Sequence, residues 1–197
     1  MFKKLQPITV ILTSILIILA VLFLYNYKPF TSSDPPFLIG GDFELIDDKG
    51  NIINQEILKK SYTLVYFGFT YCTDICPITL DIIVETIESF PRRDQEKIKV
   101  LFITLDPERD NPNVLNAYLS NYTPFVKGAT GSNDQIQNTA NKFLVLYNKI
   151  DVPQSGNYDI GHSGYIYLMN KKGEYLKHFN YDISPSILRK ELKLFIK

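Results

Sequence analysis

The spacing of apolar residues changes several times along the chain, and each change predicts a different secondary-structure element. Residues 62–69, YTLVYFGF, are β-branched and aromatic without polar alternation, which is typical of a strand covered on both faces. Residues 98–104 predict a second buried strand. Between them, apolar positions recur every three or four residues from Ile75 to about Ser89, which indicates an amphipathic helix. The chain therefore contains a strand, helix and strand in succession.

Turn formers, caps and apolar spacing predict further elements on either side of this unit. Two hairpins are expected, at 43–53 around the DKGN turn and at 165–178, and a strand is expected at 125–129. One helix is expected at 113–119, and a second begins at the Ser132 cap and runs through Lys142. A last helix begins at the Ser184 cap and carries an apolar stripe at Ile187, Leu188, Leu192 and Phe195. Parallel strands joined by helices, followed by a hairpin and a helix, predict a thioredoxin-like α/β fold, a central mixed sheet flanked by helices.

The N-terminal residues 8–25 carry no charge and approach the length of about 20 residues that crosses a bilayer. We expect a transmembrane helix. The alternative is a cleaved signal peptide, but the run is long for one and lacks a small-x-small cleavage pattern. Lys3 and Lys4 precede the helix and only Lys28 follows closely, so the N-terminus is expected in the cytoplasm or matrix, with the rest of the chain outside.

Composition divides the chain into three parts. Residues 1–27 are the N-terminal tip and anchor, residues 28–39 are a Pro- and Ser-rich linker, and residues 40–197 are the folded domain. Hydrophobic residues make up 45% of the chain, which supplies enough material for a packed core. The formal net charge is zero, so no basic surface points to nucleic acid as a partner.

The two cysteines, Cys72 and Cys76, lie between the first buried strand and the helix that follows it. Reactive groups collect at the carboxyl ends of strands in α/β folds, and a helix N-terminus stabilises a thiolate, so we expect both thiols to be reactive. A helical turn would bring them to one face. The pair could be a structural disulfide, a redox couple or half of a metal site. A disulfide closing so short a loop stabilises little, which favours the chemical roles.

Three motifs resemble the SCO/SenC family of copper chaperones: GFTYCTDICP at 68–77, LDPERD at 105–110, and His162 followed by Ser163. The resemblance runs from about residue 40 to the C-terminus. It implies a copper site made by Cys72, Cys76 and His162 that holds Cu(I) or Cu(II). It also implies a role in assembling the dinuclear copper centre of cytochrome c oxidase subunit II. Thiolates are soft ligands that favour Cu(I), and three ligands leave the ion open to a recipient.

The chain departs from the family pattern at two positions. Thr73 stands where a proline often follows the first cysteine, and Gly161 precedes His162 where an aspartate is common. Neither change removes a ligand, but both bear on metal affinity and redox tuning. A four-ligand zinc site would have to recruit His178, the other histidine. We assign His178 no role, because it lies in a predicted hairpin strand.

The loop that follows the second buried strand supplies candidate supporting residues. Asp106 either accepts a hydrogen bond that orients His162 or caps the turn at Pro107. Arg109 and Asp110 are expected to form an ion pair within the loop.

Three functions remain open from the sequence. The first is a metallochaperone, not an enzyme, that takes copper from a donor and passes it to oxidase subunit II. The second is a thiol-disulfide oxidoreductase without obligatory metal, in which Cys72 attacks, Cys76 resolves and a thiol reductase restores the pair. The third is a peroxiredoxin-like reductase, suggested by the string from Thr73 to Cys76. The resemblance places the chain in a bacterial inner membrane with its domain in the periplasm, or in the mitochondrial inner membrane facing the intermembrane space.

Overall fold

A computed structural model describes residues 6–26, 39–152 and 157–196, which belong to two compact units, residues 1–37 and 38–197. In the first unit, helix α1 spans Gln6–Asn26 and its described side chains, 10–23, are exposed. Across the described residues, no helix combines the length and apolar character that a membrane crossing requires. The anchor therefore stays a prediction. The predicted linker, apart from its last residue, lies outside the described residues.

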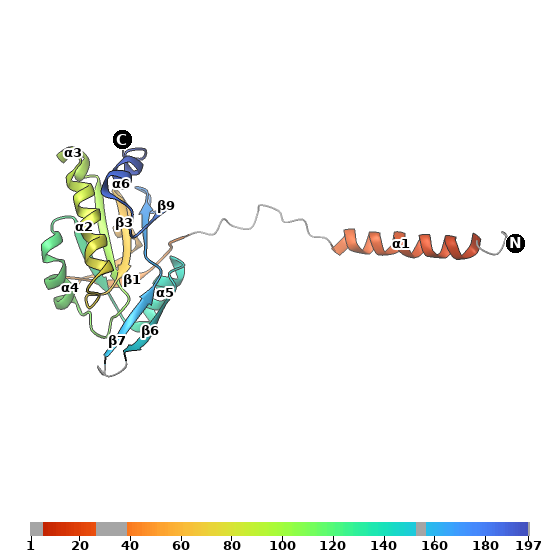
Figure 1. The fold of residues 1–197 in the computed structure, drawn as a ribbon, viewed down its shortest axis with the longest axis horizontal. Coiled ribbons are helices and arrows are strands. Elements are labelled where there is room, and N and C mark those ends of the chain that lie inside the picture. The colour runs from red at the N-terminus through yellow and green to blue at the C-terminus, as the bar shows by residue number, and fades with distance from the viewer. Residues whose placement is uncertain (1–5, 27–38, 153–156, 197) are drawn as a thin grey trace. The chain divides into compact units, whose positions relative to one another are not determined.

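The second unit is built on a seven-stranded mixed sheet (Figure 1). The strands lie in the order β2, β1, β5, β4, β3, β8, β9, and β3, β4 and β5 run parallel while the outer pairs are antiparallel. Their bounds are β1 (Glu44–Asp47), β2 (Ile52–Asn54), β3 (Tyr62–Gly68), β4 (Ile98–Thr104), β5 (Val126–Thr130), β8 (Tyr165–Met169) and β9 (Tyr175–Asn180).

Helices cover both faces of this sheet. The α-helices of the domain are α2 (Ile75–Glu88), α3 (Arg92–Gln95), α4 (Pro112–Leu119), α5 (Asn133–Lys142) and α6 (Pro185–Leu192), and the short 3₁₀ helices are η1 (Gln55–Leu58) and η2 (Ser120–Tyr122). Helix α6 packs beside α2, and the rings of Tyr118 in α4 and Phe102 in β4 lie 6.0 Å apart. The end of α5 covers the opposite face, where the Phe143 ring lies 5.3 Å from that of Phe67.

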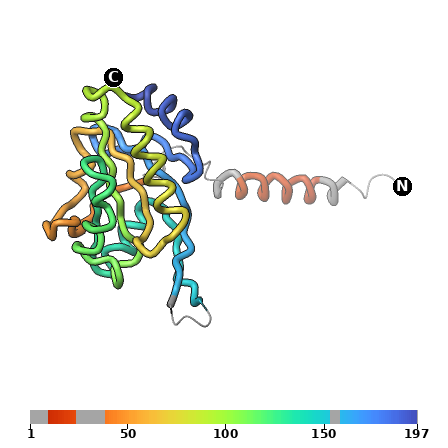
Figure 2. The backbone as a smooth tube through the Cα atoms, turned by 60° about the vertical axis from the view of Figure 1, so that its left-hand side comes forward, coloured from red at the N-terminus to blue at the C-terminus, as the bar shows by residue number. Residues whose placement is uncertain are grey.

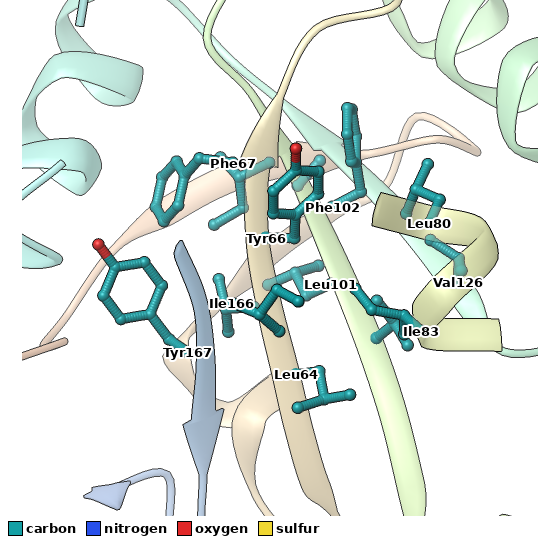
Figure 3. Packing of buried hydrophobic residues seen from close by; sticks show 14 of the residues in the cluster. Leu64, Tyr66, Phe67, Leu80, Ile83, Leu101, Phe102, Val126, Ile166 and Tyr167 are labelled. Carbon is teal, nitrogen blue, oxygen red and sulfur yellow. The ribbon is translucent and has the colours of Figure 1, made fainter. Parts of the chain in front are cut away.

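Strand β3 is central because both of its faces are apolar. Leu64 and Tyr66 point to the side of α2, where Leu80 and Ile83 lie, whereas Phe67 points to the other side (Figure 3). All of these side chains are buried. Burial of one aliphatic or aromatic side chain contributes about 1.5–3 kcal/mol, so this double-sided packing fixes where β3 ends and the next loop begins.

The thioredoxin-like α/β fold expected from the sequence is confirmed, and every predicted strand and helix of the domain is present within a few residues of its expected bounds. Ser132 caps α5 in a complete capping box with Gln135, and Ser184 caps α6. The predicted stripe of α6 was wrong at both ends: Ile187 is 53% exposed, and Phe195 lies beyond the end of the helix at Leu192 and is half-buried, while Leu188 and Leu192 are buried.

A third hairpin, made by β6 (Tyr147–Val152) and β7 (Asn157–His162), was not predicted from the sequence. This hairpin forms its own two-stranded sheet. Figures 1 and 2 show it extending from the end of the domain where α2 begins. The fold thus carries His162 on a support separate from the seven-stranded sheet.

Candidate metal centre

The cysteine loop connects the end of β3 to the first turn of α2. Asp74 is the N-cap residue of α2 but its side chain makes no capping hydrogen bond. Instead, the backbone N–H of Cys76 donates to the Cys72 sulfur over 3.3 Å. Because the first N–H groups of a helix lack partners within the helix, the Cys72 sulfur satisfies one of them and lies in the positive field of the helix end.

Cys76 is buried against the end of β3, and Cys72 is half-buried at the surface. The close packing explains one glycine of the motif. A Cβ atom on Gly68 would lie 2.9 Å from the Cys76 sulfur and 2.8 Å from the Phe102 ring, closer than side chains normally approach. A larger residue at position 68 would therefore displace the cysteine that packs over it.

The two thiols differ strongly in acidity. A hydrogen bond from the Cys76 thiol, together with backbone N–H groups at the start of α2, lowers the pKa of Cys72 to about 6 despite its partial burial. The Cys76 thiol donates this hydrogen bond to Cys72 and is buried, and both effects raise the pKa of Cys76. Of the two thiols expected to be reactive, Cys72 is therefore the more acidic in the metal-free protein. Cys72 is the thiolate at neutral pH and Cys76 keeps its proton.

His162 reaches the same place from the end of β7. Its Nε2 atom lies 4.0 Å from the Cys76 sulfur, and its Nδ1 lies 3.2 Å from the carbonyl oxygen of Ser163. A carbonyl only accepts hydrogen bonds, so Nδ1 carries the proton and the lone pair of Nε2 faces the cysteines. Burial lowers the pKa of His162, which favours the neutral ring that ligates metals.

Cys72 and His162 line one cavity of about 570 Å³, together with Tyr71, Tyr158 and Tyr181. Two sulfurs and one imidazole nitrogen are a donor set that fits copper. Cys76 and His162 are brought together, and Cys72 lies against the same helix turn. Within the described part of the chain, no three His, Cys, Asp or Glu side chains already form a group able to hold a metal ion. The three-ligand set therefore stays a prediction.

The expected ion pair between Arg109 and Asp110 was wrong. Arg109 pairs with Asp106 instead. The buried carboxylate of Asp110 accepts hydrogen bonds from the Thr70 backbone N–H, at 2.9 Å, and from the hydroxyls of Thr70 and Thr104. Burial raises the pKa of Asp110, and these three donors oppose that rise. Asp110 thereby ties the cysteine loop to the end of β4.

Asp106 has neither of the two roles expected for its side chain. Its carboxylate, completely buried, accepts hydrogen bonds from the Arg109 side chain and from the Tyr158 hydroxyl, the latter at 2.6 Å. The turn is closed by the Asp106 backbone carbonyl, which accepts from the N–H groups of Arg109 and Asp110. Asp106 therefore bonds to the hairpin that carries His162 rather than to His162 itself.

His178 and Gly161 fall where their sequence context suggested. His178 lies in β9, exposed, with its Nδ1 atom 2.6 Å from the Tyr175 hydroxyl and its ring beside Tyr165. At Gly161 a Cβ atom would lie 2.9 Å from Cδ1 of Ile150. The Ile150 side chain therefore occupies the space that an aspartate at position 161 would enter.

Tyr158 was missed by the sequence analysis, although its position carries a signal. Tyr158, Ile160 and His162 alternate along β7, and such alternation is typical of one face of a strand. The segment is short and polar between these positions, so the pattern did not stand out.

Comparison with known proteins gives one consistent family. The SCO1/SenC family model matches residues 31–197. A SCO2-like protein of Rickettsia felis is 44% identical over 162 residues, which cover 81% of this chain and 76% of that protein.

Solved structures of the same group share the fold. Bradyrhizobium japonicum ScoI with copper bound is 34% identical, with a TM-score of 0.72, over 80% of this chain and 99% of that chain. Yeast Sco1 with copper bound is 31% identical, with a TM-score of 0.73, over 80% of this chain and 87% of that chain.

Alkylation of the reduced, metal-free protein should reveal the asymmetry of the thiols. Because the pKa of Cys72 is lowered to about 6, its reaction rate with iodoacetamide should rise through that pH and level off near neutrality, while Cys76 stays largely unmodified. Peptide mass spectrometry follows the two sites separately. In Cys76→Ala the donor thiol is lost, so the midpoint for Cys72 should move upward. A wild-type midpoint near about 8.5, the value of a free cysteine, would contradict the assignment.

Proposed function

The chain belongs to the SCO1/SenC family, whose members are copper-binding proteins of cytochrome c oxidase assembly, and from this premise we propose that it is a membrane-anchored chaperone for copper. In this proposal Cys72, Cys76 and His162 hold Cu(I) or Cu(II) as cargo. The recipient is the dinuclear copper site of cytochrome c oxidase subunit II.

The observation that supports this proposal most directly is the distance of 4.0 Å between the Cys76 sulfur and His162 Nε2. These atoms come from segments 86 residues apart. A structural disulfide or a simple redox pair has no need of an imidazole with its lone pair directed at the sulfur. Soft sulfur and imidazole donors together suit copper, and a set of three leaves the ion accessible to the ligands of a recipient.

Loading and release follow from the acidity of the donors. Cys72 is already a thiolate and His162 is neutral, so each offers a lone pair without losing a proton. Cys76 must release its proton when its sulfur binds the metal, which makes affinity fall as pH decreases. During transfer the recipient's thiolates replace these donors one at a time, and Cys76 can recover its proton.

The second candidate function is thiol-disulfide exchange, and the lowered pKa of Cys72 favours it. The Cys72 thiolate attacks a disulfide of the recipient, forms a mixed disulfide and releases one recipient thiol. Cys76 then loses its proton and attacks Cys72, which forms the Cys72–Cys76 disulfide and releases the second thiol. The chain's dithiol supplies both electrons, and an external thiol reductase restores it. This activity needs neither His162 nor a metal.

We place the domain outside the membrane, in the bacterial periplasm or the mitochondrial intermembrane space. Residues 8–25 form the proposed anchor, and the lysines at positions 3 and 4 favour an N-terminus on the inner side. Both compartments also hold the copper-binding part of oxidase subunit II in this proposal, so the anchor keeps donor and recipient at one surface.

Replacement of the histidine separates the two functions at the level of binding. His162→Ala should weaken copper binding to the full chain by more than about 100-fold. Loss of a group that only orients a metal ligand already lowers metal affinity by about 10- to 100-fold, and loss of the ligand itself should cost more. Formation of the Cys72–Cys76 disulfide should be unchanged. Copper affinity is measured by competition with a chelator of known strength. His178→Ala is the matched control and should bind like wild type; equal losses in both variants would refute the assigned ligand.

Delivery can be followed directly. The copper-loaded chain, mixed with the metal-free copper domain of oxidase subunit II, should produce the absorption of a dinuclear copper centre. We expect His162→Ala to fail in this assay yet still reduce a disulfide in the recipient, as measured by thiol labelling. Cys76→Ala should fail in both. If His162→Ala forms the centre as fast as wild type, exchange of thiols rather than delivery of copper is the function.

The anchor is tested by fractionation of cells that express the full chain. Wild type should stay in the membrane pellet after an alkaline carbonate wash. The double variant Leu16→Arg/Ile17→Arg should be released, because each arginine at the centre of a spanning helix costs about 3 kcal/mol. Lys3→Gln, outside the apolar run, serves as the control. Release of the wild-type chain by carbonate would end the anchoring proposal.

A further inference from the structure

The hairpin β6–β7 needs a physical reason to hold His162 beside the cysteines. It is not hydrogen-bonded into the seven-stranded sheet, and the described side chains of β6 are mostly exposed. Its only buried residue among those described, Ile160, is 4% exposed. The ladder of β6 and β7 stabilises the hairpin internally but does not fix its direction. The short link from His162 to β8, the edge-on contact of its ring with Phe69 at 6.2 Å, and contacts between the hairpin and the rest of the domain together set the distance from His162 to Cys76.

One arginine lies between the two supports of the site. The Arg109 guanidinium carbon is 3.8 Å from the centre of the Tyr158 ring and 4.6 Å from that of the Tyr71 ring. Tyr158 lies on the hairpin four residues before His162, and Tyr71 immediately precedes Cys72. The guanidinium is thus held between a ring of the histidine hairpin and a ring of the cysteine loop.

Polar contacts fix this guanidinium in place. Arg109 Nη1 donates to the Tyr158 backbone carbonyl over 3.1 Å, and Nε donates to the buried Asp106 carboxylate. The same carboxylate accepts from the Tyr158 hydroxyl over 2.6 Å. A planar guanidinium can stack on two rings and donate in its own plane at once, which the ammonium of a lysine cannot do. The ion pair of Glu108 and Lys149, at 2.7 Å, also joins the loop that carries Arg109 to the hairpin.

The buried contacts of Arg109 should contribute far more to holding the hairpin than the exposed ion pair of Glu108 and Lys149. The side chains of Glu108 and Lys149 are 49% and 45% exposed, and exposed ion pairs contribute little to stability. The Arg109 side chain is 17% exposed and Asp106 is fully buried. Cation–π contacts and hydrogen bonds to charged groups strengthen when water is excluded.

We propose that Arg109 is a positioning residue, which couples the cysteine loop to the histidine hairpin and so keeps His162 within reach of Cys76. This inference deepens the proposed copper site and rests on it only for its effect on metal binding. In the metal-free protein the same coupling sets how far His162 is shielded from solvent. Arg109 acts through Tyr71 and Tyr158 and is not itself a ligand.

The two histidines of the chain allow a direct test without metal. Diethyl pyrocarbonate modifies accessible neutral imidazole rings, and mass spectrometry reports His162 and His178 separately. In the wild-type full chain, half-buried His162 should react more slowly than exposed His178. In Arg109→Lys the charge remains but the stacking is lost, so His162 should react about fivefold faster, with His178 unchanged. Glu108→Gln, which breaks the exposed link between the loop that carries Arg109 and the hairpin, should leave both rates at the wild-type value.

Variants on the hairpin side make the test independent of Arg109 folding effects. Tyr158→Leu removes the ring and should match Arg109→Lys, whereas Tyr158→Phe keeps the ring and should lie between it and wild type. Copper affinity should fall by about tenfold in Arg109→Lys, while the alkylation rate of Cys72 stays unchanged. An unaltered His162 rate in both Arg109→Lys and Tyr158→Leu would overturn the coupling. Failure of the wild-type chain to bind copper would instead refute the proposed function, since the metal-free rates do not depend on it.

Discussion

The burial of two carboxylates at the end of β4 constrains everything around the site. Asp106 and Asp110 are both fully buried, and a buried charge without partners costs several kcal/mol. Each therefore needs donors, and the donors come from different parts of the chain: Thr70 in the cysteine loop for Asp110, and Tyr158 in the histidine hairpin for Asp106. A single loop of the sheet thereby fixes two segments that are distant in sequence.

The asymmetry of the cysteines has the same local origin. The Cys72 sulfur takes the place of an N-cap acceptor, because the Asp74 side chain leaves that position open. Cys76 lies inside the first turn and is packed over Gly68, where no water can stabilise a thiolate. One sulfur is thus charged and accessible, and the other is neutral and protected. Such a pair can begin an exchange reaction and can also complete a metal site, which is why the dithiol alone does not decide between the two functions.

Sequence reasoning succeeded where a short-range physical signal decides the structure. The unbroken apolar run of β3, the Ser132 cap of α5 and the turn between β1 and β2 each specify their element locally. The partner of Arg109 was predicted wrongly as the adjacent residue Asp110. Adjacent side chains in a tight turn point in different directions, and Asp106, three residues earlier, faces the guanidinium. Sequence reasoning also missed the hairpin β6–β7, because the sequence YNKIDV has little apolar alternation and its attachment depends on Arg109, a distant residue. Tertiary contacts of this kind have no local pattern.

The division of the donors between two supports has an energetic consequence. The cysteine loop rests on the core through β3 and α2, where packing contributes many kcal/mol. The hairpin adds one buried aliphatic side chain, Ile160, to the core, and its other contacts described above are polar and cation–π contacts that contribute about 0.5–3 kcal/mol each in net terms. Small changes in these contacts can therefore alter the position of the imidazole without unfolding the domain. In the proposed copper site this arrangement would let the nitrogen donor leave while the dithiol stays in place.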